Sequence, residues 1–196
     1  MTSYIIEGID RIGKSTLIDN ILFHTGYHHV IHFVKPPETS YYSQKLSSFG
    51  LINPIEDNVK NRKRYNQHQY QATSFEAGFE LLSNPEQNFI FDRFHLGECV
   101  YAPRYRKYDS EYVFEIERKF HADRLSHVKL ILLVTSNWNI IEDDGKSFDF
   151  TQKEAEQQDF ITAFHKSIFQ NKKIIDVWQP NGKRKSIDEI IYEINK

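Results

Sequence analysis

The sequence predicts an α/β protein with a five-stranded parallel sheet that is flanked by helices on both faces. Short apolar runs alternate with longer amphipathic stretches, and this pattern is typical of strands joined by crossover helices. The 196 residues fit one core, because a single core serves chains of up to about 250 residues. No repeat or Pro/Gly-rich linker divides the chain, so we expect residues 1–196 to form one domain.

The expected elements alternate along the whole chain. Apolar runs predict strands at residues 4–7, 30–34, 88–92, 128–134 and 173–177. Helical spacing of apolar residues predicts helices at 14–23, 66–82, 112–125, 151–169 and 186–194. Two segments have turn-forming composition: residues 36–54 contain three prolines, and residues 142–146 are acidic and contain a glycine. We expect both to be mobile loops.

Composition argues against several classes of partner. The chain has 25 Lys and Arg against 27 Asp and Glu, and this balance favours no nucleic-acid partner. Its longest strongly apolar run, residues 130–134, is far shorter than the roughly 20 residues that span a bilayer, so we expect no membrane association. The single cysteine, Cys99, excludes an intramolecular disulfide and suits a reducing compartment such as the cytoplasm.

Residues 8–15, Gly-Ile-Asp-Arg-Ile-Gly-Lys-Ser, match a phosphate-binding loop between a strand and a helix. Glycines let backbone N–H groups close around phosphate oxygens, and a helix amino terminus favours anions. Lys14 would add positive charge from an exposed position in the loop, and Ser15 would offer its hydroxyl to Mg²⁺ between two phosphates. The segment therefore predicts a site for a nucleoside triphosphate and Mg²⁺.

Asp92 and Arg93 end the expected strand at 88–92. An acidic residue at the carboxyl end of a parallel strand lies beside the phosphates, where Asp92 can hold a water bound to Mg²⁺. The planar guanidinium of Arg93 suits a phosphate monoester, which is the group that a nucleoside monophosphate presents.

These two segments resemble the thymidylate kinase family of nucleoside monophosphate kinases. Residues 7–16, Glu-Gly-Ile-Asp-Arg-Ile-Gly-Lys-Ser-Thr, are similar to the family's phosphate loop, and Asp92-Arg93-Phe94 is similar to its Asp-Arg-Tyr motif. The resemblance implies a P-loop kinase fold that transfers the γ-phosphoryl of ATP, with Mg²⁺, to a deoxynucleoside monophosphate, with dTMP the best match. The nucleotide-binding residues would be Gly8, Ile9, Asp10, Arg11, Ile12, Gly13, Lys14, Ser15 and Thr16.

The resemblance also implies roles on the acceptor side. Asp10 would lie near the 3′-hydroxyl of the acceptor sugar, and Arg93 would hold the acceptor phosphate. Tyr101 falls where the family has a tyrosine that faces the substrate, although a half-buried core tyrosine is an equal alternative. Lys35 occupies the place of a family arginine in a loosely similar segment.

The base end of the acceptor departs from the family pattern. Tyr70 aligns with a phenylalanine that stacks on the base, but Ser74 replaces the arginine that reads it. This leaves the acceptor base open. Arg104 lies in a segment that mixes cations with aromatic residues, and either Arg104 or Arg106 could close on the acceptor, the alternative being a surface loop.

Family members with an arginine in the phosphate loop tend to lack the catalytic arginines that others carry in the lid. Here the loop contains Arg11, and the candidate lid at 141–150 contains Lys146 but no arginine. One cation must reach the transferring phosphoryl group, so we expect Arg11, Lys14, Asp92 and Arg93 to be the catalytic residues.

Two other classes of protein, nucleoside kinases and GTP-dependent switches, also contain a phosphate loop of this kind. A deoxynucleoside kinase would use Asp92 as a base and would not need Arg93 for a monophosphate. A GTP-dependent switch is disfavoured, because Ile174 stands where an Asn-Lys-x-Asp guanine reader requires aspartate. The sequence leaves the oligomeric state open, a homodimer included.

Overall fold

A computed structural model describes residues 2–26, 28–33, 56–141 and 149–196. The expected loops at 36–54 and 142–146 lie outside these residues, as do Lys35 and Lys146. The described chain forms a five-stranded, fully parallel sheet in the order β2-β3-β1-β4-β5. The strands are β1 (Ser3–Glu7), β2 (His29–His32), β3 (Phe89–Asp92), β4 (Val128–Val134) and β5 (Lys172–Asp176). The predicted fold class is confirmed.

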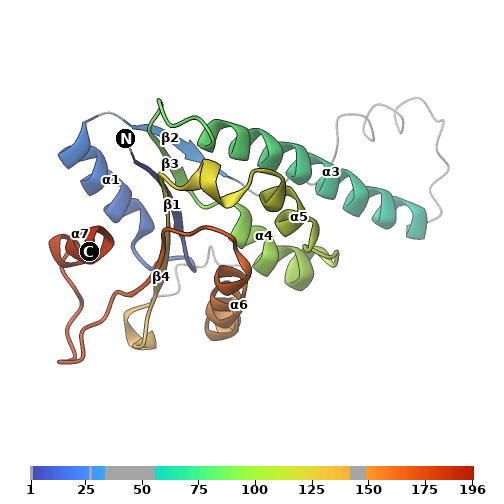
Figure 1. The fold of residues 1–196 in the computed structure, drawn as a ribbon. Helices are drawn as coiled ribbons and strands as arrows, with labels where there is room; N and C mark the ends of the chain where they lie inside the picture. Colours follow the sequence, from blue (N-terminus) through green and yellow to red (C-terminus); the bar gives the residue numbers. More distant parts are fainter. Residues whose placement is uncertain (1, 27, 34–55, 142–148) are drawn as a thin grey trace.

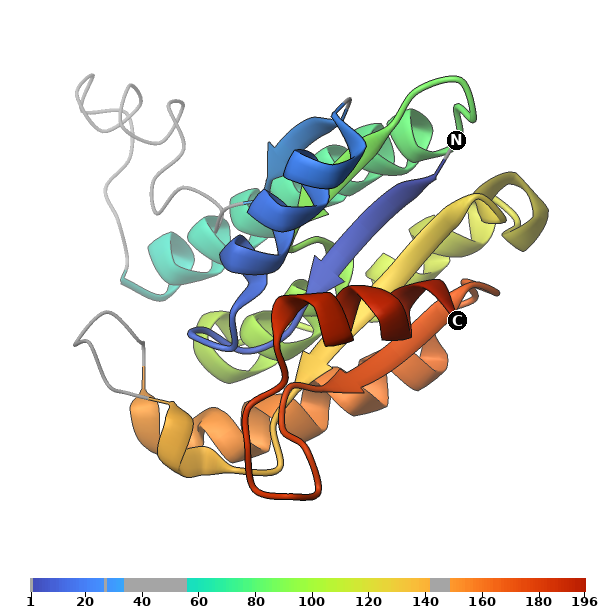
Figure 2. The same cartoon turned by 90° about the vertical axis from the view of Figure 1, so that its left-hand side faces the viewer.

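Helices cover both faces of this sheet (Figure 1). One face carries α1 (Lys14–Thr25) and α7 (Ile187–Asn195), which contact each other and lie in front of the strands in Figure 2. The other face carries α3 (Glu56–Leu82), α4 (His95–Tyr101), α5 (Tyr112–Lys119) and α6 (Lys153–Lys166). Every crossover connection therefore packs against the sheet that it joins, as parallel strands require.

The core lies where the central strands meet these helices. β1 and β4 are apolar on both faces because helices cover both, and Ile5, Ile6, Leu130 and Leu132 have almost no exposed surface. Between the sheet and α3, the ring of Phe94 packs against three other rings, at centroid distances of 4.8–5.4 Å from Phe75, Phe79 and Phe91. This packing fixes the start of α4 against β3 and α3.

Several predicted boundaries were wrong. The helix expected at 66–82 begins ten residues earlier, at Glu56, and the helix expected at 112–125 ends at Lys119. It stops there because His121 adopts φ 51°, which no α-helix accommodates, and a 3₁₀ turn follows at Ala122–Leu125. The helix expected at 151–169 is α6, which ends where Ser167 becomes extended and its hydroxyl donates to Glu117 at 2.5 Å.

Helix α4 was not predicted. It has seven residues and continues into a π-helical turn at Ala102–Arg106, so it is too short to give a recognisable helical pattern. It begins two residues after Arg93, with Phe94 between them, and it carries Tyr101 in its last turn. The unpredicted element therefore positions part of the candidate site.

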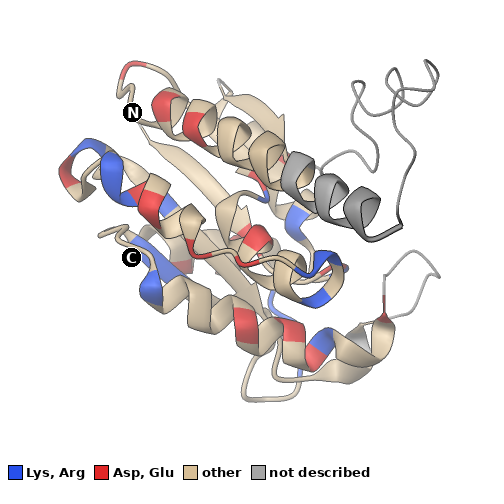
Figure 3. Cartoon of the chain, turned by 90° about the vertical axis from the view of Figure 1, so that its right-hand side faces the viewer, with Lys and Arg blue, Asp and Glu red and all other residues tan. Residues whose placement is uncertain are grey.

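The described residues include no helix that is both long and apolar enough to cross a bilayer. Acidic and basic residues are interspersed along the helices on the side of the molecule that Figure 3 shows.

Candidate active site

The phosphate loop connects β1 to α1 at the carboxyl end of the central strand. Gly8 has φ 138°, and a Cβ there would lie 2.6 Å from the carbonyl oxygen of Leu133 in β4. Gly13 has φ 106° and precedes α1 directly. Within the described chain no side chain caps this helix, so its first N–H groups are available to an anion. The predicted strand-loop-helix arrangement is present, with Ser15 and Thr16 exposed.

Lys14 is buried rather than exposed, contrary to the expectation from the sequence. Only 6% of its surface is accessible, and its Nζ donates to the carbonyl oxygens of Gly8 and Ile9 at 2.9 and 2.7 Å. Burial, and then the charge of the nearby Arg93, lower the pKa of Lys14 to about 8, against the opposing effect of neighbouring carboxylates. The ammonium group is held inside the loop, where it can reach phosphate oxygens.

Asp10 and Arg93 form an ion pair between the phosphate loop and the residue that follows β3. Both side chains are partly exposed, at 28% and 42%. Arg93 also has φ 64°, a left-handed conformation that turns the chain sharply out of the strand. The structure therefore brings together two predicted residues that are 83 positions apart in the sequence.

Glu7, at the end of β1, holds the start of α4. Its Oε1 accepts hydrogen bonds from the backbone N–H groups of Phe94 and Leu96 at 2.9 and 3.0 Å. Phe94 is the N-cap residue and offers no side-chain oxygen of its own. Glu7 has no exposed surface, and this burial raises its pKa. A carboxylate from β1 thus caps the helix that follows Arg93.

Asp92 has two different carboxylate oxygens. Its Oδ2 lies 2.9 Å from Nδ1 of His32, at the end of neighbouring β2. Its Oδ1 is buried and has no hydrogen-bond partner within the part of the chain that the structure describes. A buried carboxylate oxygen without a partner, beside a phosphate loop, fits a water molecule bound to Mg²⁺. The donor set of Asp92 and the exposed hydroxyl of Ser15 is therefore chemically suited to Mg²⁺.

The predicted acceptor residues occupy three places. Tyr101 lies near the Asp10–Arg93 pair: burial raises the pKa of its phenol well above 10, and the charge of Asp10 adds to this shift. Its hydroxyl has no partner among the residues that the structure describes. Tyr70 and Ser74 lie on α3, where Tyr70 is 48% exposed and the Ser74 hydroxyl donates to the Tyr70 carbonyl at 2.8 Å. Arg104 points to α6 and donates to Asp159 at 2.7 Å.

Lys153 was not singled out in the sequence, yet it lies beside the loop. It is 3% exposed, and its Nζ lies 2.8 Å from Oε2 of Glu156 and 3.8 Å from Oδ2 of Asp10. It is the first residue of α6, directly after the candidate lid. No spacing in the sequence links Lys153 to Asp10, because the contact arises from the packing of α6 against the sheet.

Arg184 was also missed, because it lies in a run of three basic residues, 183–185, and such runs are typical of solvated surfaces. Its Nη2 donates to the carbonyl oxygen of Ile12 at 3.1 Å, and a Cβ on Gly13 would lie 2.7 Å from that nitrogen. Trp178 and Arg184 form an antiparallel bridge, so the segment between β5 and α7 folds back on itself. Arg184 is therefore the third cationic side chain from outside the loop that contacts it, after Arg93 and Lys153.

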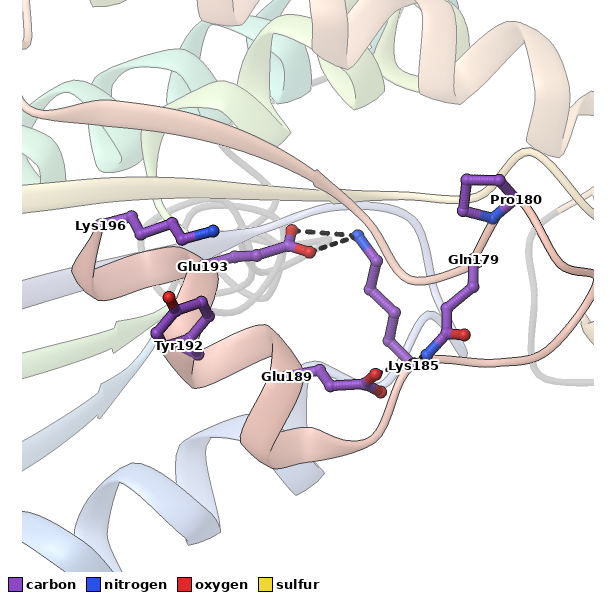
Figure 4. Close-up of a pocket in the computed structure, with 7 residues that line it drawn as sticks. All are labelled: Gln179, Pro180, Lys185, Glu189, Tyr192, Glu193 and Lys196. Atoms are coloured by element: carbon purple, nitrogen blue, oxygen red, sulfur yellow. Dashed lines mark hydrogen bonds and ion pairs between the residues drawn. The ribbon is translucent and has the colours of Figure 1, made fainter.

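The same segment is tied to α7 (Figure 4). Lys185 pairs with Glu193 at 2.8 Å, and the Gln179 amide donates to Glu189 at 2.6 Å. These contacts line a surface hollow of about 400 Å³ that contains none of the predicted site residues. Lys185, Glu189 and Glu193 each have a partner in these contacts, which anchor the segment that carries Arg184.

Comparison with known proteins identifies the family. The family model described as thymidylate kinase matches residues 6–185, which is most of the chain. The chain belongs to the thymidylate kinase family. It is therefore a transferase of the nucleoside monophosphate kinase class, and the family match includes both motifs on which the resemblance rested.

Individual relatives of this thymidylate kinase family member are distant. A thymidylate kinase of Dictyostelium discoideum is 25% identical over 197 residues, covering 97% of this chain and 82% of the relative. The structure of thymidylate kinase from Ehrlichia chaffeensis has a TM-score of 0.56 at 12% identity, covering 99% and 96% of the two chains. Deoxyadenosine kinase from M. mycoides, with dCMP and dCDP bound, gives 0.53 at 18% identity, covering 99% of both. These two structures support the fold.

Proposed function

We propose that the protein is an ATP-dependent kinase of deoxynucleoside monophosphates, with dTMP as acceptor and dTDP as product. One observation carries this proposal: the Asp10–Arg93 ion pair joins the phosphate loop to the arginine after β3. A guanidinium beside the donor loop suits an acceptor that is itself a phosphate. A nucleoside acceptor has no charge for Arg93 to hold.

The donor triphosphate would lie on the loop and the start of α1. Lys14 and the N–H groups of the loop would hold the β- and γ-phosphates, and Arg11 would approach the transferring group from the exposed side of the loop. Mg²⁺, held by Ser15 and through water by Asp92, would supply charge neutralisation between the phosphates. The chemistry then depends on position and charge, because a phosphate monoester acceptor is already an anion near pH 7.

The acceptor would displace the present partner of Arg93. The acceptor phosphate would take the guanidinium from Asp10, which leaves the Asp10 carboxylate to accept a hydrogen bond from the sugar. Lys153 lies 3.8 Å from Asp10 and would hold that carboxylate in place by ion pairing. These residues bind and orient two anionic substrates, which is the main task of a phosphoryl-transfer site.

A coupled assay with ATP tests this proposal on a panel of ribo- and deoxynucleosides and their 5′-monophosphates. We expect turnover with dTMP and none with thymidine. Arg93→Ala should raise the KM for dTMP and lower kcat far more than it changes ATP binding, because it removes a charge-assisted contact to the acceptor. Arg118→Ala, which removes an exposed arginine of α5, is the matched control.

Equal activity of the parent protein on thymidine and dTMP would contradict the proposal and favour a nucleoside kinase with Asp92 as base. Location in the cytoplasm and assembly as a homodimer stay predictions. Fractionation of cells and light scattering of the purified protein test them.

A further inference from the structure

With Ser74 in place of the family's arginine, that position has no side chain to recognise the base of the acceptor. The described structure has another polar side chain close to it in the same helix. Gln71 lies on α3 between Tyr70 and Ser74 and is 5% exposed. Its Nε2 donates to Oε2 of Glu98 on α4 at 3.3 Å, whereas its Oε1 is buried and has no hydrogen-bond partner among the described residues. A buried amide oxygen without a partner is costly, and such groups mark places where a ligand completes the bonding.

Glu98 fixes which end of this amide faces outward. Its carboxylate is 3% exposed and is paired with Arg106. Its Oε1 accepts from the hydroxyls of Tyr108 and Tyr112 at 2.5 and 3.0 Å. Burial raises the pKa of both tyrosines, and the charge of Glu98 raises it further, so both stay protonated donors.

A carboxylate accepts hydrogen bonds and donates none. The side of Gln71 that faces Glu98 must therefore be its NH₂ group, because the opposite orientation would place two acceptor oxygens against each other. Glu98 thus holds Gln71 as an acceptor toward any ligand, with its carbonyl oxygen turned away from the carboxylate. The remaining donors around Glu98 are engaged with it and do not compete for Oε1 of Gln71.

The place of Gln71 fits the base end of an acceptor whose phosphate lies at Arg93. Helix α4 begins two residues after Arg93, and Gln71 contacts this helix at Glu98. Glu98 and Tyr101 are three residues apart and share a helix face, and the charges of Arg93 and Asp10 act on the Tyr101 phenol.

We propose that Oε1 of Gln71 accepts a hydrogen bond from the N3–H of thymine, and that Glu98 is the positioning residue that sets this polarity. The proposal rests on the proposed function and names its specificity. Thymine and uracil carry a hydrogen on N3, whereas cytosine has an unprotonated acceptor there. Gln71 would therefore favour dTMP and dUMP and reject dCMP by placing two acceptors together.

The first experiment removes the hydrogen bond in two ways, by changing the N3–H donor of the nucleotide and by changing the Gln71 acceptor. We expect N3-methyl-dTMP to lose at least tenfold in kcat/KM with the parent protein, whereas 4-thio-dTMP, which keeps N3–H, stays a good acceptor. Gln71→Leu should lower kcat/KM for dTMP about tenfold, which corresponds to one hydrogen bond, and should shrink the penalty of the N3-methyl group. Gln71→Met, which keeps the length of the side chain, serves if the leucine variant does not fold.

The second experiment tests the role of Glu98. Glu98→Gln lets the amide of Gln71 turn, because an amide at position 98 can donate as well as accept. The ratio of kcat/KM for dTMP to that for dCMP should fall about tenfold, with the KM for ATP unchanged. Glu115→Gln makes the same change on the exposed face of α5 and is the matched control.

A merely structural role would affect stability alone. Tyr112→Phe removes one donor to Glu98 without touching Gln71, and it should lower the melting temperature while the dTMP:dCMP ratio stays constant. An unchanged ratio in both Gln71→Leu and Glu98→Gln, with dTMP still phosphorylated, overturns this inference and leaves the proposed function intact. Failure of the parent protein to phosphorylate dTMP overturns both.

Discussion

Two arginines of the candidate site adopt the left-handed conformation, Arg11 with φ 69° and Arg93 with φ 64°. Such a conformation costs a residue other than glycine about 1 kcal/mol or more, and it persists where the surroundings hold it in place. The sequence indicated that one of these cationic residues lies in the phosphate loop and that the other follows β3. It could not indicate their backbone conformation, because that depends on how the loop lies against β4 and α4.

The left-handed conformation makes Arg11→Gly a selective test of catalysis. Glycine adopts φ 69° without strain, so we expect the melting temperature to be maintained or raised. Loss of the guanidinium should lower kcat on the order of 10³-fold, with a much smaller effect on ATP affinity, because the contact strengthens in the transition state. Arg11→Lys should rescue only in part, since an ammonium lacks the planar fork.

Kinetics of Lys146→Ala, measured together with those of Arg11→Gly, decide whether the loop or the lid supplies the catalytic cation. A greater loss of kcat in the lid variant than in Arg11→Gly would assign the catalytic cation to the lid.

Lys14 predicts a pH dependence of donor binding. Its pKa is lowered to about 8 in the free protein, and bound phosphates would raise it, so binding should take up a proton near pH 8. Affinity for a non-hydrolysable ATP analogue should be nearly constant below pH 8 and should fall as pH rises above it. Calorimetry in two buffers with different ionisation enthalpies measures the proton uptake.

Lys14→Met supplies the control, because it should bind the analogue weakly and without proton uptake. Equal uptake by the variant would assign the titration to another group.

At the scale of elements, the sheet was more predictable than the helix that presents Arg93. β1 and β4 are rich in apolar residues, as is typical of strands that helices cover on both faces, and the sequence located both. The sequence did not predict α4, because this helix has no helical periodicity and no local capping residue in its sequence, His-Leu-Gly-Glu-Cys-Val-Tyr. Its cap is Glu7, which lies 87 positions before Phe94, so tertiary structure supplies what the local sequence lacks.

This capping predicts a graded response at position 7. Glu7→Leu leaves the N–H groups of Phe94 and Leu96 buried without partners and should destabilise the protein by about 2 kcal/mol or more. Glu7→Gln keeps one acceptor oxygen and should cost less. Because the start of α4 positions Arg93, the leucine variant should also raise the KM for dTMP. Chemical denaturation and steady-state kinetics measure the two effects.

Equal stability of the leucine and glutamine variants would show that the bonds of Glu7 to α4 contribute little.

The segment between β5 and α7 leads to a similar prediction for the binding of ATP. Arg184 donates to the Ile12 carbonyl and covers Gly13, so Arg184→Ala should loosen the loop and raise the KM for ATP several-fold. The KM for dTMP should change little. Lys183→Ala, which alters the neighbouring exposed lysine, is the matched control, and a rise in the acceptor KM instead would contradict this role.

At the scale of the molecule, the candidate site exists only because the sheet brings distant segments to one edge. Its residues come from the phosphate loop, the end of β3, the start of α6 and the segment after β5. Motif spacing located the first two, since each follows an apolar strand directly. It could not locate Lys153 or Arg184, because nothing in their local sequence records the strand order β2-β3-β1-β4-β5 that places them beside the loop.

The shared core predicts that the chain unfolds as one unit. The buried cluster runs without interruption from β1 to α7, and it includes residues from all the helices that cover the sheet. Far-ultraviolet circular dichroism, which reports the helices, and fluorescence of Trp138 and Trp178, which lie after β4 and β5, should therefore give coincident transitions. A non-hydrolysable ATP analogue at 100 times its Kd should stabilise the folded state by about 2.7 kcal/mol. For a chain of this size the melting temperature should rise by about 5–10 °C, by the same amount with both probes. Two separate transitions, or a shift seen by one probe alone, would show that the site and the remainder of the chain fold independently.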